Sequence, residues 1–334
     1  AVNFTGGNQT LWGTVYGQAT SAWGVGFAGG NQTINGTVIG SATCSSSSTG
    51  GAVHFFTGAN TTINGDLLGI GASQGLMFGG NALINGNVTG SAISGLDGGG
   101  IGFAAGKQTI IGHVQGVSVS VLNGSQAVYF IGGNQTITGN LDGTALGSEA
   151  LYFGGGYQTL GGNVTGISNA GIGVRFAASS NLAFSTTGQS TSILGTSNGG
   201  IGIKMDAAAT VPFSNTNNAT LLFQGVSNAS QGIVISSNIV SFTNSGAGNV
   251  IISGITAGNN TQGLLINSSQ NISFISSGSG ALNIYGSATN SSASNTTGIS
   301  ICSTSANFTR FVNNGMGNLN ITGVTASTNA SALV

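Results

Sequence analysis

Carboxylates are the first candidates for chemistry in this chain. The acidic residues are Asp66, Asp97, Asp142, Glu149 and Asp206. Glycoside hydrolysis needs two carboxyl groups about 5 to 10 Å apart. Asp142 and Glu149 are close in sequence, but Glu149 falls in a predicted loop, and Asn87 aligns with Asp66 in the next repeat of the chain. We therefore expect a protein that is not an enzyme and needs no cofactor, and we keep a polysaccharide-degrading enzyme as a remote alternative.

The histidines and the basic residues do not form a recognisable binding motif. His54 and His113 lie in different repeats, without a Cys or carboxylate at metal-ligand spacing. The basic residues are scattered along the chain: Lys107, Arg175, Lys204 and Arg310. A net charge of −1 also lacks the electrostatic attraction on which nucleic-acid binding depends. We expect neither a metal nor a nucleic-acid partner.

Cys44 and Cys302 are separated by about ten repeats, or roughly 48 Å of a stacked solenoid. A disulfide needs Cα atoms within about 7 Å, which excludes a bond within one chain. If copies join head to tail, both cysteines lie near the same junction. An interchain disulfide between Cys44 and Cys302 is then the remaining option.

Asn-x-Ser/Thr triplets are abundant. In the second half and in loops they are candidate glycosylation sites, with Asn267, Asn295 and Asn320 as examples. The alternative is that the triplet arises from a composition rich in Asn, Gly, Ser and Thr. For Asn8, Asn31, Asn60 and Asn134 we favour that alternative, because we expect these side chains to be buried in a ladder that leaves no room for a glycan.

These residues are carried by a repeated unit. FAGGNQTINGTVIG at 27–40 nearly repeats FTGGNQTLWGTVYG at 4–17. Further copies begin at Phe56, Met77, Phe103, Phe130 and Phe153. Aligned on the residue after the Gly pair, which we call the anchor, the copies follow one another at intervals of 21 to 29 residues. This period is typical of a solenoid in which each copy forms one turn, or rung.

The aligned copies form columns of like residues. The anchors are Asn8, Asn31, Asn60, Asn81, Lys107, Asn134 and Tyr157. Four residues before the anchor stand Phe4, Phe27, Phe56, Met77, Phe103, Phe130 and Phe153. Three after it stand Leu11, Ile34, Ile63, Ile84, Ile110, Ile137 and Leu160. Because alternate strand residues face opposite sides, the apolar columns predict a core, and the Gly-Gly-Asn segment predicts a turn with Asn side chains in a ladder.

The residues two after the anchor are mostly Thr, in a single column. An ice-binding surface needs two such columns, so we do not favour that function. After about residue 171 the pattern loosens, although GIGVRF, GIGIKM, GIVI, GLLI and GISI still predict strands at roughly 29- to 35-residue spacing. We predict one continuous all-β domain, regular over 1–170 and looser over 171–334.

The predicted fold is a parallel β-helix of about twelve rungs, each about 4.8 Å from the next, without a helical cap. We expect right-handed winding, the commoner hand for rungs of this length. Only 3% of residues are charged, yet no run of 18 apolar residues predicts a membrane span. Ala1 runs almost directly into the first copy, so we expect any targeting peptide to have been removed.

The FxGGNQTIxGxVxG unit, the Gly-rich rungs, the Asn-x-Thr triplets and the scarcity of Cys resemble secreted β-helical adhesins. These are the passengers of bacterial autotransporters and two-partner secretion systems, such as the filamentous haemagglutinin group. The resemblance covers most of the chain and implies a secreted or cell-surface protein used in adhesion or biofilm.

Two functions follow as expectations. The first is a structural extracellular protein that self-assembles end to end into a fibre or sheath, because neither end shows the polar capping repeat of solenoids and little charge keeps copies apart. The second is a surface adhesin fragment that binds host or surface glycans through exposed Asn, Thr and aromatic residues. The expected partner is thus another copy of the chain, or a glycan.

Overall fold

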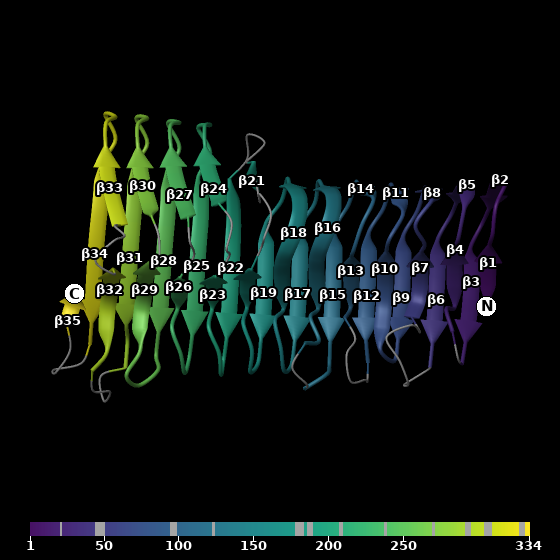
Figure 1. The fold of residues 1–334 in the computed structure, drawn as a ribbon, viewed down its shortest axis with the longest axis horizontal. Coiled ribbons are helices and arrows are strands. Elements are labelled where there is room, and N and C mark those ends of the chain that lie inside the picture. Colours follow the sequence, from purple (N-terminus) through teal and green to yellow (C-terminus); the bar gives the residue numbers. More distant parts are fainter. Residues whose placement is uncertain are drawn as a thin grey trace. The chain divides into compact units, whose positions relative to one another are not determined.

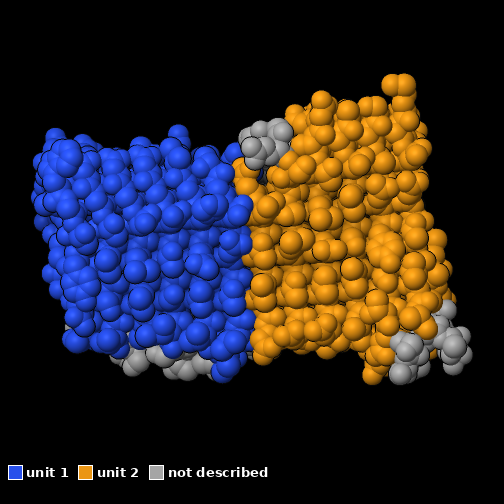
Figure 2. Space-filling model, turned by 180° about the vertical axis from the view of Figure 1, so that it is seen from behind, with its two compact units in different colours: residues 1–160 blue, residues 161–334 orange. Residues whose placement is uncertain are grey.

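The computed structural model consists of parallel β-strands stacked rung upon rung (Figure 1). It describes residues 1–20, 22–43, 51–93, 99–121, 124–177, 184–185, 190–206, 210–236, 239–268, 271–290, 295–303, 309–326 and 331–334. In these residues all helix and strand structure is β-strand, and no helix that could span a membrane is found. The chain divides into two compact units, residues 1–160 and 161–334 (Figure 2), which are described in turn. The predicted parallel β-helix is confirmed.

Each rung of unit 1 has three strand segments. The first are β1 (Val2–Phe4), β4 (Val25–Phe27), β7 (Gly51–Phe55), β10 (Gln74–Phe78) and β13 (Ile101–Phe103). The second are β2 (Asn8–Trp12), β5 (Gly30–Asn35), β8 (Ala59–Ile63), β11 (Asn81–Ile84) and β14 (Lys107–Ile110). First and second segments are continuous in β16 (Val128–Ile137) and β18 (Leu151–Leu160). The third are β3 (Val15–Ala19), β6 (Val38–Ala42), β9 (Leu67–Gly71), β12 (Val88–Ala92), β15 (Val114–Ser118) and β17 (Leu141–Ala145).

A column of stacked phenylalanines runs through the core of unit 1. Its members are Phe4, Phe27, Phe55, Phe78, Phe103, Phe130 and Phe153, with consecutive ring centroids 4.6 to 5.0 Å apart. Two members of the predicted column, Phe56 and Met77, were wrong. The backbone register instead pairs Phe55 with both Phe27 and Phe78, and the column of like residues is otherwise as predicted.

The corner between the first and second strands explains this correction. It spans one residue more before Asn60 and one fewer before Asn81 than in the rung of Asn31, so counting back from the anchor selects the wrong residue. The positive φ at this corner falls on glycine, as at Gly30, the first residue of β5, whose φ is +74°. Asn31 follows it within the strand. The corner absorbs changes in length without disturbing the stack.

Glycine is also required on the third strands, which pass close to the start of the first strand of the next rung. A Cβ on Gly90 would overlap the carbonyl oxygen of Gly100, and one on Gly116 would overlap that of Ala127. This close backbone approach accounts for the Gly found nine residues after every anchor of the first seven copies.

A buried glutamine ladder lies inside unit 1, which the sequence pattern did not reveal. Gln108, Gln135 and Gln158 are each at most 1% exposed. Gln135 Nε2 donates to Gln108 Oε1 at 2.8 Å, and Gln158 Nε2 to Gln135 Oε1 at 2.9 Å. The same nitrogens donate to the corner carbonyls of Gly132 and Gly155 at 2.9 and 2.8 Å. The ladder thus gives partners to the buried amide nitrogens of Gln135 and Gln158 and to the corner carbonyls, while Oε1 of Gln158 at its end is buried without a partner among the described residues.

Unit 2 has larger rungs arranged in three sheets. The first contains β20 (Val174–Phe176), β23 (Ile203–Met205), β26 (Ile233–Ile235), β29 (Gln262–Ser268), β32 (Thr297–Ser303) and β35 (Ser331–Leu333). The second contains β19 (Val164–Ser168), β22 (Thr191–Ser197), β25 (Leu221–Ser227), β28 (Val250–Thr256), β31 (Leu282–Ala288) and β34 (Leu319–Thr325). The third contains β21 (Phe184–Ser185), β24 (Thr210–Asn215), β27 (Ile239–Asn244), β30 (Ile272–Ser276) and β33 (Thr309–Asn313).

The looser strand signals predicted for this half are in register. Val174 pairs with Ile203, and the column continues through Ile233, Leu264 and Ile299. The additional sheet has its own aromatic stack, in which the rings of Phe213, Phe242, Phe274 and Phe311 lie 4.9 to 5.4 Å apart. Buried Asn244 closes its corner, because its Nδ2 donates to the carbonyl of Gly248 at 2.9 Å. The larger rung is therefore built on the same like-on-like principle.

The close approach at Gly90 gives a testable prediction. We expect Gly90→Ala to lower the free energy of unfolding by about 1 to 3 kcal/mol, because the new methyl group forces the backbone apart in a packed interior. Gly6→Ala is the matched control, since nothing lies within 4 Å of a Cβ at Gly6. Urea unfolding measures both variants. Equal stability of the two would contradict the proposed role of Gly90.

Candidate binding surface

The outer face of β5, β8, β11 and β14 presents a regular array of polar groups. Along β5, Gln32 and Ile34 face the interior, whereas Asn31, Thr33 and Asn35 face outward. The parallel register repeats these outward positions on each following strand. The face therefore consists of two amide columns with a mainly Thr column between them.

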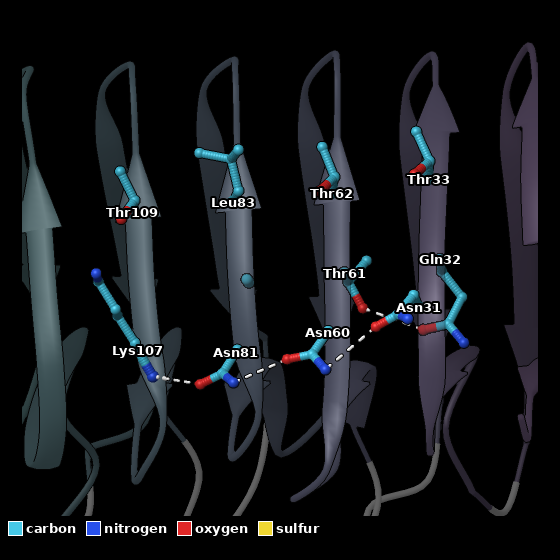
Figure 3. Close-up of a pocket in the computed structure, with 11 residues that line it drawn as sticks. Asn31, Gln32, Thr33, Asn60, Thr61, Thr62, Asn81, Leu83, Lys107 and Thr109 are labelled. Atoms are coloured by element: carbon cyan, nitrogen blue, oxygen red, sulfur yellow. Dashed lines mark hydrogen bonds between the residues drawn. The ribbon is translucent and has the colours of Figure 1, made fainter. Parts of the chain in front are cut away.

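The first amide ladder comprises Asn8, Asn31, Asn60 and Asn81 (Figure 3 shows the last three). Each Nδ2 donates to the Oδ1 of the preceding rung: Asn31 to Asn8 at 3.0 Å, Asn60 to Asn31 at 3.2 Å, and Asn81 to Asn60 at 2.8 Å. The ladder ends where the backbone N–H of Lys107 donates to Asn81 Oδ1 at 2.8 Å. The predicted ladder is confirmed, but its predicted burial was wrong: the anchors occupy outward strand positions and are exposed.

The second amide ladder comprises Asn35, Asn64 and Asn85. Asn64 Nδ2 donates to Asn35 Oδ1 at 2.7 Å, and Asn85 Nδ2 to Asn64 Oδ1 at 2.6 Å. Between the two ladders runs the Thr column, made of Thr33, Thr62 and Thr109 and interrupted by Leu83. Two of these three columns use amide groups, which both donate and accept hydrogen bonds.

A shallow hollow of about 390 Å³ lies between the first amide ladder and the Thr column. Asn31, Asn60 and Asn81 line one side, and Lys107 lies at its end (Figure 3). No acidic residue is among those that line it. Amide and hydroxyl groups both donate and accept hydrogen bonds, so these walls of the hollow are suited to hydrogen bonding with a polyhydroxylated ligand.

Asp66, Asp142 and Glu149 are not among the residues that line this hollow. Asp66 Oδ1 accepts the backbone N–H of Asn87 at 2.8 Å, in agreement with their predicted alignment. Asp142 pairs in register with Gln115. Glu149 Oε2 accepts from Ser148 Oγ at 2.6 Å and from Gln126 Nε2 at 3.3 Å. Asp97 lies outside the described residues.

Two basic residues that are far apart in sequence are neighbours in the structure. Arg175 pairs in register with Lys204 on adjacent strands, so the expectation of scattered basic residues was wrong for this pair. Asp206 accepts Arg175 Nη2 at 2.8 Å and lies 3.1 Å from Lys204 Nζ. Burial alone would raise the pKa of Asp206, but hydrogen bonds and charge from the two cations outweigh it and lower that pKa. Aligning GIGVRF with GIGIKM would have revealed the pair.

His54 belongs to an aromatic cluster and not to a polar site. Its ring centroid lies 4.1 Å from that of Trp23 and 3.8 Å from that of Phe56. Its Nδ1 is buried without a hydrogen-bond partner among the described residues. Burial lowers the pKa of His54 to about 4. His113 is exposed, and its Nδ1 accepts the backbone N–H of Asn140 at 2.9 Å.

The candidate modification sites are exposed in unit 2. Asn267 and Asn295 lie on the surface, and Asn295 has a φ of +53°, which Asn tolerates better than most residues. Asn320 is also exposed, although its Nδ2 donates to Asn283 Oδ1 at 2.8 Å. Cys302 is an exposed free thiol. Cys44 lies outside the described residues, so glycosylation and the interchain disulfide stay predictions.

His54 predicts a pH dependence of stability. Between its ordinary pKa of 6.5 and about 4, the unfolded chain binds a proton that the folded chain does not. The free energy of unfolding should therefore fall as pH is lowered through this window. His54→Phe keeps an aromatic ring in the cluster and should flatten the dependence, whereas His113→Gln should keep it. Urea unfolding from pH 7 to pH 4 measures the slope, and an unchanged slope in His54→Phe would count against this assignment.

The comparisons with known proteins do not indicate a function, so a function is proposed from the geometry of the chain. No family model matches the chain, and no curated protein or solved structure does either. The resemblance to secreted β-helical adhesins thus rests on the sequence pattern alone and stays a prediction.

Proposed function

We propose that the protein is a structural extracellular β-helix whose copies join end to end into a fibre or sheath. The observation that carries this proposal is that each rung stacks on a near copy of itself, Phe on Phe and Asn on Asn. A surface that stacks on its own copy within the chain is also suited to stack on the same surface of another chain. The chain has only four basic residues, which leaves few sites for trypsin-like proteases and suits an extracellular location.

Apolar residues of the core columns are accessible on the first and last described rungs. Leu11 on β2 is 38% exposed, whereas Ile34, its partner in the next rung, is fully buried. Phe311 on β33 is half-buried, although it stacks on Phe274, which is fully buried. Unpaired strand edges recruit further strands. On the same strand as Leu11, Asn8 presents the first amide of the first amide ladder.

A charge placed on this edge should block assembly. We expect Leu11→Glu to reduce fibre formation strongly, because docking would bury an unpaired carboxylate. Ile111→Glu is the matched control, since Ile111 is 52% exposed but lies in the middle of unit 1. Electron microscopy and sedimentation measure assembly, and circular dichroism checks the fold. Monodisperse wild-type protein at high concentration would overturn the proposal.

Glycan binding is a second candidate, favoured by the hollow on the polar face. Its amide and hydroxyl groups match the hydrogen-bonding groups of a sugar. Two exposed aromatic rings lie on the same series of strands: Trp12, which pairs in register with Asn35, is 82% exposed, and Tyr157, in the anchor column, is 58% exposed. Aromatic rings with an apolar face and an accessible polar group are frequent in recognition surfaces.

Asn60 tests this second function, since it lies in the middle of the first amide ladder. We expect Asn60→Ala to weaken oligosaccharide binding about two- to tenfold, the range of one or two lost hydrogen bonds. Asn163→Ala, in unit 2 and outside the hollow, is the control. A glycan array followed by calorimetry provides the measurement. Unchanged affinity in Asn60→Ala would exclude this hollow as the binding site.

A further inference from the structure

Lys107 interrupts the first amide ladder with a positive charge. It occupies an anchor position, pairs in register with Asn134, and contributes its backbone N–H to Asn81. It is the only Lys or Arg in residues 1–160. Its side chain is exposed and extends along the outer face toward Thr109 (Figure 3). The one basic side chain of this unit therefore borders the hollow.

The charge of Lys107 is not neutralised by a neighbour in the part of the chain that the structure describes. The described ion pairs of this chain involve Arg175, Lys204 and Asp206. Asp66 and Glu149 take part in other hydrogen bonds, and neither lines the hollow. The hollow thus combines a wall of neutral amides and hydroxyls with one ammonium group that is available to an anion.

We propose that the hollow binds an acidic saccharide, with Lys107 pairing with a sugar carboxylate while the amides and threonines bind hydroxyl groups. This inference rests on the second function above and gives it a ligand class. An ammonium group provides three donors and a compact charge without the fixed geometry of Arg. It therefore selects for charge, and the ladder supplies the hydrogen bonds that a neutral sugar would also make.

The test compares an oligosaccharide of glucuronate with its methyl ester, which has the same rings without the charge. We expect wild-type protein to bind the acid about two- to fivefold more tightly than the ester, the range of one exposed ion pair. Lys107→Gln should remove this preference by weakening the binding of the acid. Lys107→Arg should retain the preference. Arg310→Gln, the same charge change at an exposed position of unit 2, should have no effect.

The outcomes separate this inference from the function on which it rests. Equal affinity of the wild type for acid and ester would overturn the role of Lys107, while binding of either that is weakened in Asn60→Ala would uphold the glycan surface. A preference that persists in Lys107→Gln would also overturn the inference. Binding of neither compound would overturn this inference, while binding of a neutral oligosaccharide that is weakened in Asn60→Ala would still uphold the glycan surface. A preference that disappears at about 1 M salt, where the screening length is about 3 Å, would support the ion pair.

Discussion

The in-register stacking of like residues is the constraint on which the rest of this structure depends. Parallel strands lie about 4.8 Å apart, so each side chain meets its own counterpart at that distance in the rungs on either side. Phenylalanine rings suit this spacing when they lie parallel, and their centroids in unit 1 are 4.6 to 5.0 Å apart. Amides suit it because one end donates and the other accepts. The same spacing thus favours phenylalanine in the core and asparagine on the surface.

Stacking also accounts for the scarcity of charge. A charged residue repeated in a column would face like charges about 5 Å away, a repulsion of about 1 kcal/mol in water and about 3 kcal/mol near a protein surface. Asparagine gives a polar surface without this cost. Arg175 and Lys204 are two like charges on adjacent strands. Their repulsion is offset because both cations pair with the carboxylate of Asp206. A composition with 3% charged residues is therefore a consequence of the fold.

The sequence was informative where a column repeats and uninformative where a corner changes length. The Ile column and the Asn ladder could be predicted because alternation and repetition both point to them. Phe55 and Phe78 could not, because the corner before the anchor gains a residue in one rung and loses one in the next. The buried Gln ladder was missed because glutamine is ordinarily a surface residue. Its burial depends on corner carbonyls that only the folded chain brings near.

The ladder does not use all the hydrogen-bond donors and acceptors of the outer amides. A side-chain amide has two N–H groups and a carbonyl with two lone pairs, and within the ladder Asn31 and Asn60 each use one donor and one acceptor site on one another and on their neighbours. One donor and one acceptor site of each remain toward solvent. The same residues can therefore hold successive rungs together and bind a ligand on the outside. Because stacking disfavours repeated charge, the recognition that we propose for this face depends on hydrogen bonds everywhere except at Lys107. There the ladder ends, and a single charge has no like neighbour in its column.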